Sequence, residues 1–261
     1  MEVQCSRALS ESKLPGLDFA LNPYIGCQHG CVYCYAPSIM HVDRDEWGTF
    51  VKIRRRLVNQ LERELKGRSG VIGLGTMTDP YQPVEDRTRI TRRCLEAISR
   101  SDMKVSVHTK SDLVLRDIDI LQGMVDAEVG ITVTSIDASI STSIEPGAPP
   151  PQRRIDALSK LIEEGVDSYA LIGPILPLVI DRDKEAFVEA ISSTGIKRVM
   201  FDPLRLRTGM MDHMVKRLKD LEGFDLSKFS KLSDSREYFL LIQQELDEMF
   251  RRKGVRCIDV F

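Results

Sequence analysis

The amino-acid sequence predicts an α/β fold built on a parallel sheet, and three features of its pattern support this prediction. Short β-rich runs alternate with helical stretches along most of the 261 residues, as parallel strands joined by helical crossovers require. Several of the β-rich runs are apolar nearly throughout, which is typical of strands covered on both faces. About six strand–helix units are present, too few for an eight-unit barrel. The residues therefore leave an open partial barrel or a flat doubly wound sheet.

The predicted strands follow one another at regular spacing. The first, FALNPYIG at 19–26, is the weakest and leads directly into a group of cysteines. The stronger strands are GVIGLG (70–75), KVSVHTK (104–110), EVGITVTS (128–135), SYALIGPIL (168–176) and IKRVMFDPL (196–204).

Helical patterns lie between and after these strands. In the clearest of them Ile155, Leu158, Leu161 and Ile162 form one apolar stripe, and Gly165 is a stop signal. The predicted helices cover 51–66, 86–100, 112–124, 152–165, 183–194 and 210–222, with one more amphipathic helix at 234–252. We expect an N-terminal extension at 1–18, the barrel at 19–207, and a C-terminal helical segment at 208–261 that closes the barrel.

Composition and overall charge give no positive indication of a nucleic-acid or membrane partner. The hydrophobic fraction is 42%, the charged fraction 29% and the net charge −2, so bulk electrostatics indicate neither nucleic acid nor an anionic membrane. No apolar run approaches the roughly 20 residues of a membrane span, and the N-terminus lacks a signal-peptide pattern. We expect a cytoplasmic protein without a membrane partner, in which thiols stay reduced and clustered cysteines bind metal.

Unusual residues follow the predicted strands at their carboxyl ends. These segments are GTMTDPYQPVE, TKSD, TVTSID and GPILPLVID. Pro80, Pro83, Pro174 and Pro177 indicate shaped loops in place of simple helix starts. Because active sites of parallel α/β folds lie at this end of the strands, we expect these loops to face a common site.

The run IGCQHGCVYCYAP brings Cys27, Cys31 and Cys34 together on one loop. Iron–sulfur clusters are held by cysteine thiolates, and three thiolates would leave one iron of a four-iron cluster open to a small molecule. Gly26 and Gly30 would let the loop fold tightly. A zinc site is disfavoured, because His29 between two of the cysteines would strain the loop as a fourth ligand. Three structural cysteines at this spacing are equally disfavoured.

This CxxxCxxC spacing, with the aromatic Tyr33 before the last cysteine, resembles the signature of the radical S-adenosylmethionine superfamily. LNPYIGCQHGCVYCYAP, EWGTFVKI, GTMTDPYQPVE and EPGAPPPQRRIDAL together resemble its spore-photoproduct-lyase-like branch, often labelled DNA repair photolyases. The resemblance covers residues 14 to 205. It implies a partial (β/α)6 TIM-like barrel, a 4Fe–4S cluster, S-adenosylmethionine, and an electron donor of the ferredoxin or flavodoxin type.

The resemblance also implies roles for individual residues. Cys27, Cys31 and Cys34 would ligate the cluster, and Tyr33 would meet the adenine. The remaining cofactor contacts would come from Thr78 and Asp79 at the methionine end, Lys110 at the carboxylate, Thr132 through a hydrogen bond, and Arg154, paired with Glu145.

Three of these residues have a simpler structural interpretation. Lys110 could be a solvated loop lysine, Asp79 a turn residue before Pro80, and Thr132 a β-branched strand residue. No catalytic residue is assigned from the sequence.

Two departures from the family pattern limit the resemblance. GLGTMTDPYQP contains no cysteine, whereas spore photoproduct lyase uses one near this loop to return a hydrogen atom to its substrate, which makes that repair chemistry doubtful here. Ile180 stands where relatives often carry a polar residue. Among the other thiols, Cys94 is expected to be a buried hydrophobe, and Cys5, near a mobile terminus, is a candidate hydrogen donor.

These observations favour a radical S-adenosylmethionine enzyme that abstracts hydrogen from an unidentified substrate. An open barrel mouth would suit a nucleic acid or a protein. Basic runs at 54–56, 87–93, 153–154, 205–207 and 251–256 could track phosphates, although solvated helix faces balanced by acids are favoured. The alternatives are an iron–sulfur electron-transfer or regulatory protein without cofactor cleavage, and a zinc-stabilised scaffold.

Overall fold

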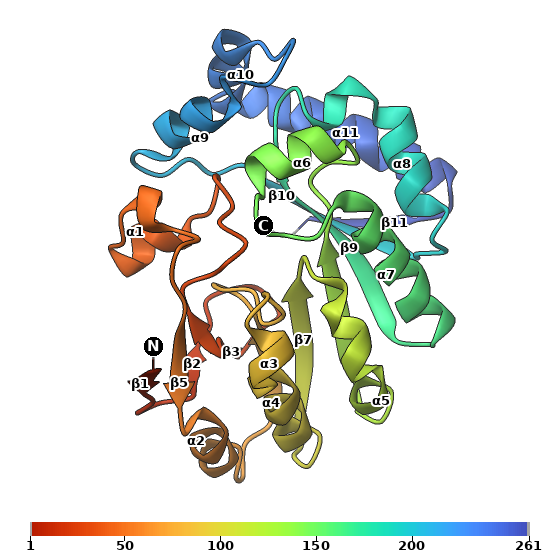
Figure 1. The fold of residues 1–261 in the computed structure, drawn as a ribbon. Coiled ribbons are helices and arrows are strands. Elements are labelled where there is room, and N and C mark those ends of the chain that lie inside the picture. Colours follow the sequence, from red (N-terminus) through yellow and green to blue (C-terminus); the bar gives the residue numbers. More distant parts are fainter. Residues whose placement is uncertain (1, 260–261) are drawn as a thin grey trace.

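The structure is a computed structural model that describes residues 2–259, and its centre is a curved sheet of eight strands (Figure 1). The strand order is β11-β10-β9-β8-β7-β6-β3-β2. Every neighbouring pair from β3 to β11 is parallel, and only β2 (Leu9–Glu11) pairs antiparallel, with β3. The α/β fold with a parallel sheet is confirmed, and the sheet curves as an open partial barrel.

The parallel strands fall on the predicted runs, except β11 near the end of the chain, which was not predicted. They are β3 (Phe19–Leu21), β6 (Gly70–Leu74), β7 (Met103–Thr109), β8 (Ala127–Thr132), β9 (Asp167–Ile175), β10 (Arg198–Pro203) and β11 (Arg256–Asp259). The predicted first strand is too long, because Pro23 has no N–H for a ladder and the chain resumes in β4 (Tyr24–Ile25). Val105, Val107 and Val129 are fully buried, as two-sided coverage requires.

The prediction of a helix over 51–66 is wrong at its start. Residues 52–55 form β5 (Lys52–Arg55), which pairs with β1 (Glu2–Gln4) and β4 in a separate three-stranded sheet. Both edges of β5 are thus hydrogen-bonded, and the left-handed backbone of Arg56 (φ 60°) separates it from α2 (Leu57–Glu64). The sequence of this segment is compatible with a helix or a strand, so the pairing with β1 and β4 determines that it forms a strand.

Two other predicted helices are broken. The helix over 86–100 divides into α3 (Glu85–Thr88) and α4 (Ile90–Ile98) at Arg89, whose φ is 50°. The helix over 112–124 begins as a 3₁₀ turn, η2 (Asp112–Asp117), and continues as the short α5 (Ile118–Leu121). The predicted helices that form as expected are α7 (Pro151–Glu163), α8 (Lys184–Ser192), α9 (Met210–Leu218) and α11 (Arg236–Arg252).

Several short helices were not predicted. They are α1 (Ala36–Met40), η1 (Arg44–Glu46), α6 (Ala138–Ile144), η3 (Ile180–Arg182) and α10 (Leu226–Ser233). In Figure 1, α1, α6 and α9 gather above the carboxyl ends of β7 and β9, whereas α2 and α4 lie near the opposite ends. In the described part of the chain, no helix has the length and apolar character that crossing a membrane requires.

Candidate active site

The loop that carries the three cysteines follows β4 and lies against the segments after β6 and β8. Gln82, after β6, accepts from the Gln28 backbone N–H at 2.9 Å and donates to the Gly26 carbonyl at 3.2 Å. On the other side, the Val32 N–H donates to the Ile144 carbonyl at 2.9 Å. The loop is therefore fixed through its backbone at the carboxyl ends of the parallel strands, where the sequence predicts a site.

Close approach of backbones sets the shape of this loop. A Cβ on Gly147 would lie 1.9 Å from the Gln28 carbonyl oxygen, and the Gly147 N–H donates to the His29 carbonyl at 3.0 Å. Gly26 has a φ of +87°, and a Cβ there would lie 2.4 Å from the Phe50 carbonyl oxygen. Only glycine fits at either position.

The three thiols on this loop are free; Cys27 and Cys31 are buried and Cys34 is half-buried. Burial raises the pKa of each thiol, that of Cys27 to about 12. The thiols are thus protonated in the metal-free chain, and loading a metal centre would release protons.

The donor set fits a four-iron cluster with one open iron. Across residues 2–259, no three His, Cys, Asp or Glu side chains converge on a point that could hold a single metal ion. A four-iron cluster does not need such a point, because each thiolate binds a different iron.

A buried charge network lies beside Cys31. Glu145 accepts from the Tyr33 hydroxyl, and its Oε2 lies 2.5 Å from Nη1 of Arg154. Both Glu145 and Arg154 are about 1% exposed. Arg154 also donates to the carbonyls of Pro149 at 2.8 Å and Thr132 at 3.3 Å, so the guanidinium is fixed from several sides.

Lys110 joins this network more loosely. Its Nζ lies 3.9 Å from Oε1 of Glu145, beyond hydrogen-bond distance, and 5.6 Å from the centre of the Tyr33 ring. Burial alone would lower the Lys110 pKa, but Glu145 and Asp79 raise it, and Cys31 adds to this once its thiol is ionised, so the ammonium stays charged. Because Nζ of Lys110 lies beyond hydrogen-bond distance of the Glu145 carboxylate, it can turn to an anionic ligand.

Thr78 and Asp79 hold the cysteine loop in place. The Thr78 hydroxyl donates to the Tyr24 carbonyl at 3.0 Å. Asp79 accepts from the Thr109 hydroxyl at 2.7 Å and the Lys110 N–H at 2.8 Å, and its Oδ2 lies 3.3 Å from Nδ1 of His29. These contacts occupy both Asp79 oxygens; a contact with the methionine end of the cofactor stays a prediction.

Asp79 is also strongly acidic. Burial would raise its pKa, but His29 and the hydrogen bonds from Thr109 and Lys110 hold it at about 2. The Asp79 carboxylate is thus ionised in its buried position.

Sequence reasoning placed some residues correctly and missed others. Thr132 is buried at the end of β8, and Cys94 is fully buried, as expected. The expectation that Cys5 lies near a mobile terminus is wrong, because β1 pairs with β5 and Cys5 packs in the core at 6% exposure; its role as a hydrogen donor stays a prediction. The sequence analysis missed Asn22 and Gln82 as residues that support the loop. Asn22 stands in LNPYIGC and accepts from the Met77 N–H at 2.9 Å, and Gln82 stands between two prolines of a shaped loop.

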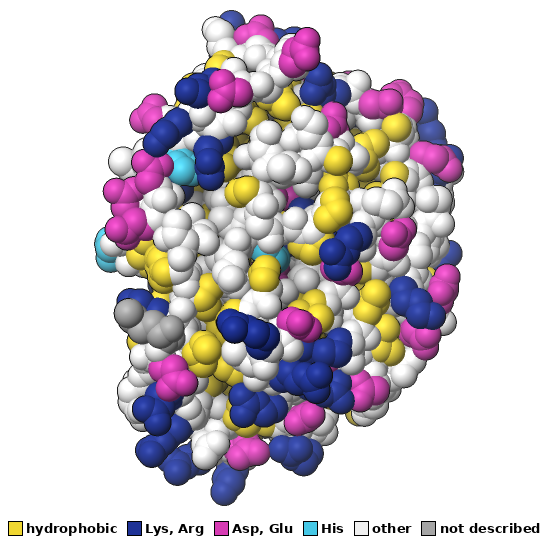
Figure 2. Space-filling model, in the orientation of Figure 1, with side chains coloured by type: hydrophobic (Ala, Val, Ile, Leu, Met, Phe, Trp, Pro, Cys, Tyr) yellow, Lys and Arg dark blue, Asp and Glu magenta, His cyan; other side chains and the backbone are white. Residues whose placement is uncertain are grey.

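Several arginines of the basic runs are paired with acidic side chains. Arg153 and Arg154 diverge, since Arg153 pairs with Asp112 on the surface while Arg154 is buried. Arg92 is held by Asp117 and Asp119. Figure 2 shows Lys and Arg gathered along the lower edge of the view, over α2 and α4. The interpretation of helix faces balanced by acids fits these contacts.

A partial α/β barrel that presents three free thiols and a half-buried lysine ammonium at the carboxyl ends of its strands has the features expected of a cofactor-binding iron–sulfur protein. The chain belongs to the radical S-adenosylmethionine superfamily, whose model matches residues 21–192. The superfamily and its two cofactors, a 4Fe–4S cluster and S-adenosylmethionine, are thereby confirmed.

The chain is similar to proteins of archaea and bacteria. It is 35% identical over 183 residues to an uncharacterized protein of Methanocaldococcus jannaschii, covering 69% of each chain. It is 28% identical to an uncharacterized protein of Mycobacterium bovis, over 79% of this chain and 65% of that one. The fold resembles that of a spore photoproduct lyase mutant solved with bound AdoMet and dinucleoside spore photoproduct, with a TM-score of 0.72 and 15% identity. That match covers 97% of this chain and 80% of the lyase.

Proposed function

We propose that this radical S-adenosylmethionine enzyme holds its cluster through Cys27, Cys31 and Cys34 and uses it to cleave S-adenosylmethionine reductively. When bound, the cluster and cofactor supply a 5′-deoxyadenosyl radical that abstracts hydrogen from the substrate. The observation that carries this proposal is the position of Lys110: its charged ammonium lies between the thiol loop, Tyr33 and Glu145, and beyond hydrogen-bond distance of the Glu145 carboxylate.

The residues of the network would divide the work of binding. Lys110 binds the cofactor carboxylate, as a cation with one shared carboxylate can. Glu145 and Arg154 fix the Tyr33 hydroxyl, so that the ring keeps one orientation for the adenine. Thr132 adds a hydrogen bond at the end of β8, while Thr78 and Asp79 hold the loop close to the cofactor.

We place a nucleic acid ahead of a protein as the substrate. The structurally similar lyase was solved with a dinucleoside, which supports a nucleoside-containing ligand in a barrel of this shape. The fate of the substrate radical would differ from repair by that lyase, because residues 70–84 contain no cysteine. The segment 208–261 would close the barrel over the substrate, and a ferredoxin or flavodoxin would supply the electron.

The test is anaerobic reconstitution with iron and sulfide, followed by reduction with S-adenosylmethionine and an assay for 5′-deoxyadenosine. We expect product from the unaltered chain and from Cys257→Ala, whose half-buried thiol lies in β11, but none from Cys31→Ala. A fully loaded four-iron cluster that yields no 5′-deoxyadenosine would contradict the proposal and favour an electron-transfer or regulatory protein.

A further inference from the structure

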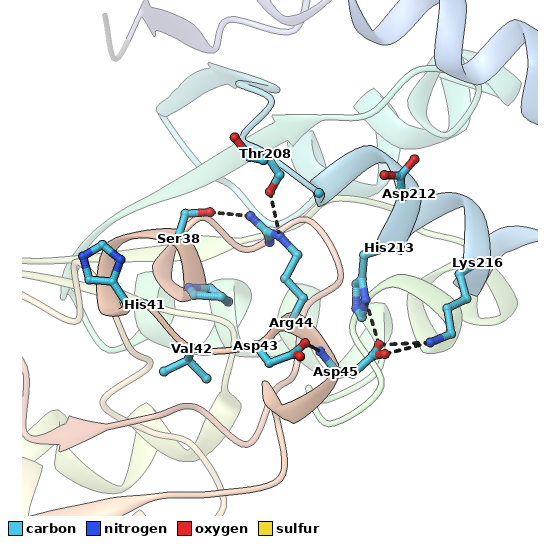
Figure 3. Close-up of a pocket in the computed structure, with 12 residues that line it drawn as sticks. Ser38, His41, Val42, Asp43, Arg44, Asp45, Thr208, Asp212, His213 and Lys216 are labelled. Atoms are coloured by element: carbon cyan, nitrogen blue, oxygen red, sulfur yellow. Dashed lines mark hydrogen bonds and ion pairs between the residues drawn. The ribbon is translucent and has the colours of Figure 1, made fainter.

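The side chain of Arg44 links the stretch that carries the third cysteine to a distant part of the chain, and Figure 3 shows its contacts with Ser38 and Thr208. Its Nη1 donates to the Cys34 carbonyl at 2.8 Å, its Nη2 to the Ser38 hydroxyl at 2.5 Å, and its Nε to the Thr208 carbonyl at 3.3 Å. Cys34 and Ser38 belong to the cluster loop and α1. Thr208 is 164 residues away, in what we define as the C-terminal arm, residues 204–218.

The neighbouring residue ties the same two parts together. Asp45 accepts from Nζ of Lys216 at 2.9 Å and lies 3.4 Å from Nδ1 of His213, both on α9 (Figure 3). Gly209 begins α9 with a φ of +69°, which turns the arm back toward Arg44. Arg44 and Asp45 therefore form consecutive polar links from η1 to the arm.

The junction surrounds an open hollow. This hollow of about 580 Å³ lies between α1, η1 and α9, and charged and polar side chains that include Arg44, Asp45 and His213 line part of it. The apolar face of α9, with Met210, Met214 and Leu218, is buried in the core. The contacts of Arg44 and Asp45 with the arm therefore lie at the edge of a hollow, where solvent can reach them.

The arm also reaches the loop by a second route. α9 packs against α6, whose last residue, Ile144, accepts the hydrogen bond from the Val32 N–H. The backbone is thereby held at Val32 by α6 and at Cys34 by Arg44 of η1. Both α6 and η1 contact α9. A displacement of α9 would move both supports of the loop.

We propose that Arg44 is a positioning residue that couples docking of the C-terminal arm to the conformation of Cys34. The arm includes the start of the segment 208–261, which the proposed function places over the substrate, so the inference rests on that function. When the arm is docked, the Cys34 peptide is fixed; when the arm is displaced, Cys34 becomes more exposed and its thiolate less well oriented.

The coupling is tested first in the metal-free full chain. Arg44→Lys keeps the charge but loses the planar fork that bridges three acceptors. Asp45→Asn weakens the ionic contact with α9 and leaves the Arg44 bonds in place. For both variants we expect faster backbone hydrogen exchange over 204–218 and alkylation of the Cys34 thiol about three- to tenfold faster. The alkylation rates of Cys27 and Cys31 should change less than about twofold. Arg100→Met, which breaks a surface ion pair with Glu62, is the matched control and should change neither the hydrogen exchange of the arm nor the alkylation rate of Cys34.

Two results would overturn the proposal. One is an Asp45→Asn variant whose arm exchanges backbone hydrogens faster while the alkylation rate of Cys34 stays unchanged, since the arm would then not act on the loop. The other is an Arg44→Lys variant in which the alkylation rate of Cys34 is unchanged.

In the reconstituted chain we expect Arg44→Met to shift the cluster midpoint potential to more negative values, because a cation near the ligand loop is lost. Failure of the proposed function would show separately, as absence of 5′-deoxyadenosine from the unaltered chain.

Discussion

At the scale of single residues, the site is defined by one buried carboxylate that lies between two cations. Glu145 is the carboxylate that Lys110 and Arg154 share, and it is closer to Arg154. Burial would raise the Glu145 pKa, but the two cations lower it, so the group stays ionised. Removing one member of such a buried network leaves another charge uncompensated, so each substitution should lower the free energy of unfolding.

Lys110→Met should weaken S-adenosylmethionine binding about tenfold to hundredfold, the loss of one charge-assisted hydrogen bond. Equilibrium dialysis against the reconstituted chain measures this directly. Lys104→Met is a matched control, because Lys104 lies at the other end of β7 with an exposed ion pair. Equal affinities for the two variants would remove Lys110 from the cofactor site.

Asp79 should make the metal-free chain sensitive to acid. Its pKa is about 2 in the folded chain, against about 3.9 when unfolded, so its contribution is fully present above about pH 5. That contribution, roughly 2 kcal/mol, is lost as the pH falls through 4 toward 2. In urea unfolding, the free energy of unfolding of Asp79→Asn should be lower than that of the unaltered chain at pH 6, and this difference should become smaller at low pH. A difference that is constant with pH would contradict the linkage between Asp79 ionisation and stability.

At the scale of elements, the shape of the cysteine loop depends on backbone hydrogen bonds with the segment 144–147, which begins at the last residue of α6. This segment is hydrogen-bonded to Val32 through Ile144 and to His29 through Gly147, and the second contact requires a residue without a Cβ. The loop is therefore shaped by two stretches more than a hundred residues apart in sequence.

Gly147→Ala should destabilise the chain by about 1–3 kcal/mol, since its Cβ would overlap the Gln28 carbonyl. It should also reduce the iron bound on reconstitution. Gly123→Ala is the control, because the nearest atom to its Cβ would be 3.5 Å away. Chemical denaturation and iron analysis compare the two; equal stability would mean that the loop can shift freely.

At the scale of the whole molecule, the C-terminal segment is part of the central structure. β11 pairs parallel with β10, and α11 packs on α8 and β11. Leu246 on α11 is fully buried in the same core cluster as the strands. The last elements therefore share a core with the sheet that holds the site.

Leu246→Ala should lower the free energy of unfolding by about 2–5 kcal/mol, the range for deleting a buried leucine side chain. Leu240→Ala on the same helix should have little effect, because Leu240 is 58% exposed. Circular dichroism and tryptophan fluorescence of Trp47 should report one coincident transition. Separate transitions for α11 and for the surroundings of Trp47 would show that the C-terminal segment unfolds independently.

Much of the fold was readable from local pattern. Strand runs such as GVIGLG and SYALIGPIL are apolar enough to favour burial on both faces, and they became β6 and β9. The segment 51–66 was misjudged because β5 exists only through its two partner strands. β11 was likewise missed, since four residues near the end of the chain form a strand only beside β10.

The sequence by itself determined the chemistry of this protein: three thiols at fixed spacing on a glycine-containing loop, followed by polar segments after successive strands. Those features are local, so they can be read without a structure. Only the tertiary structure decided that Glu145 lies between Lys110 and Arg154, and that Arg44 joins Cys34 to Thr208. Such contacts unite residues far apart in the chain, and their energies depend on distance and burial, which a linear pattern does not contain.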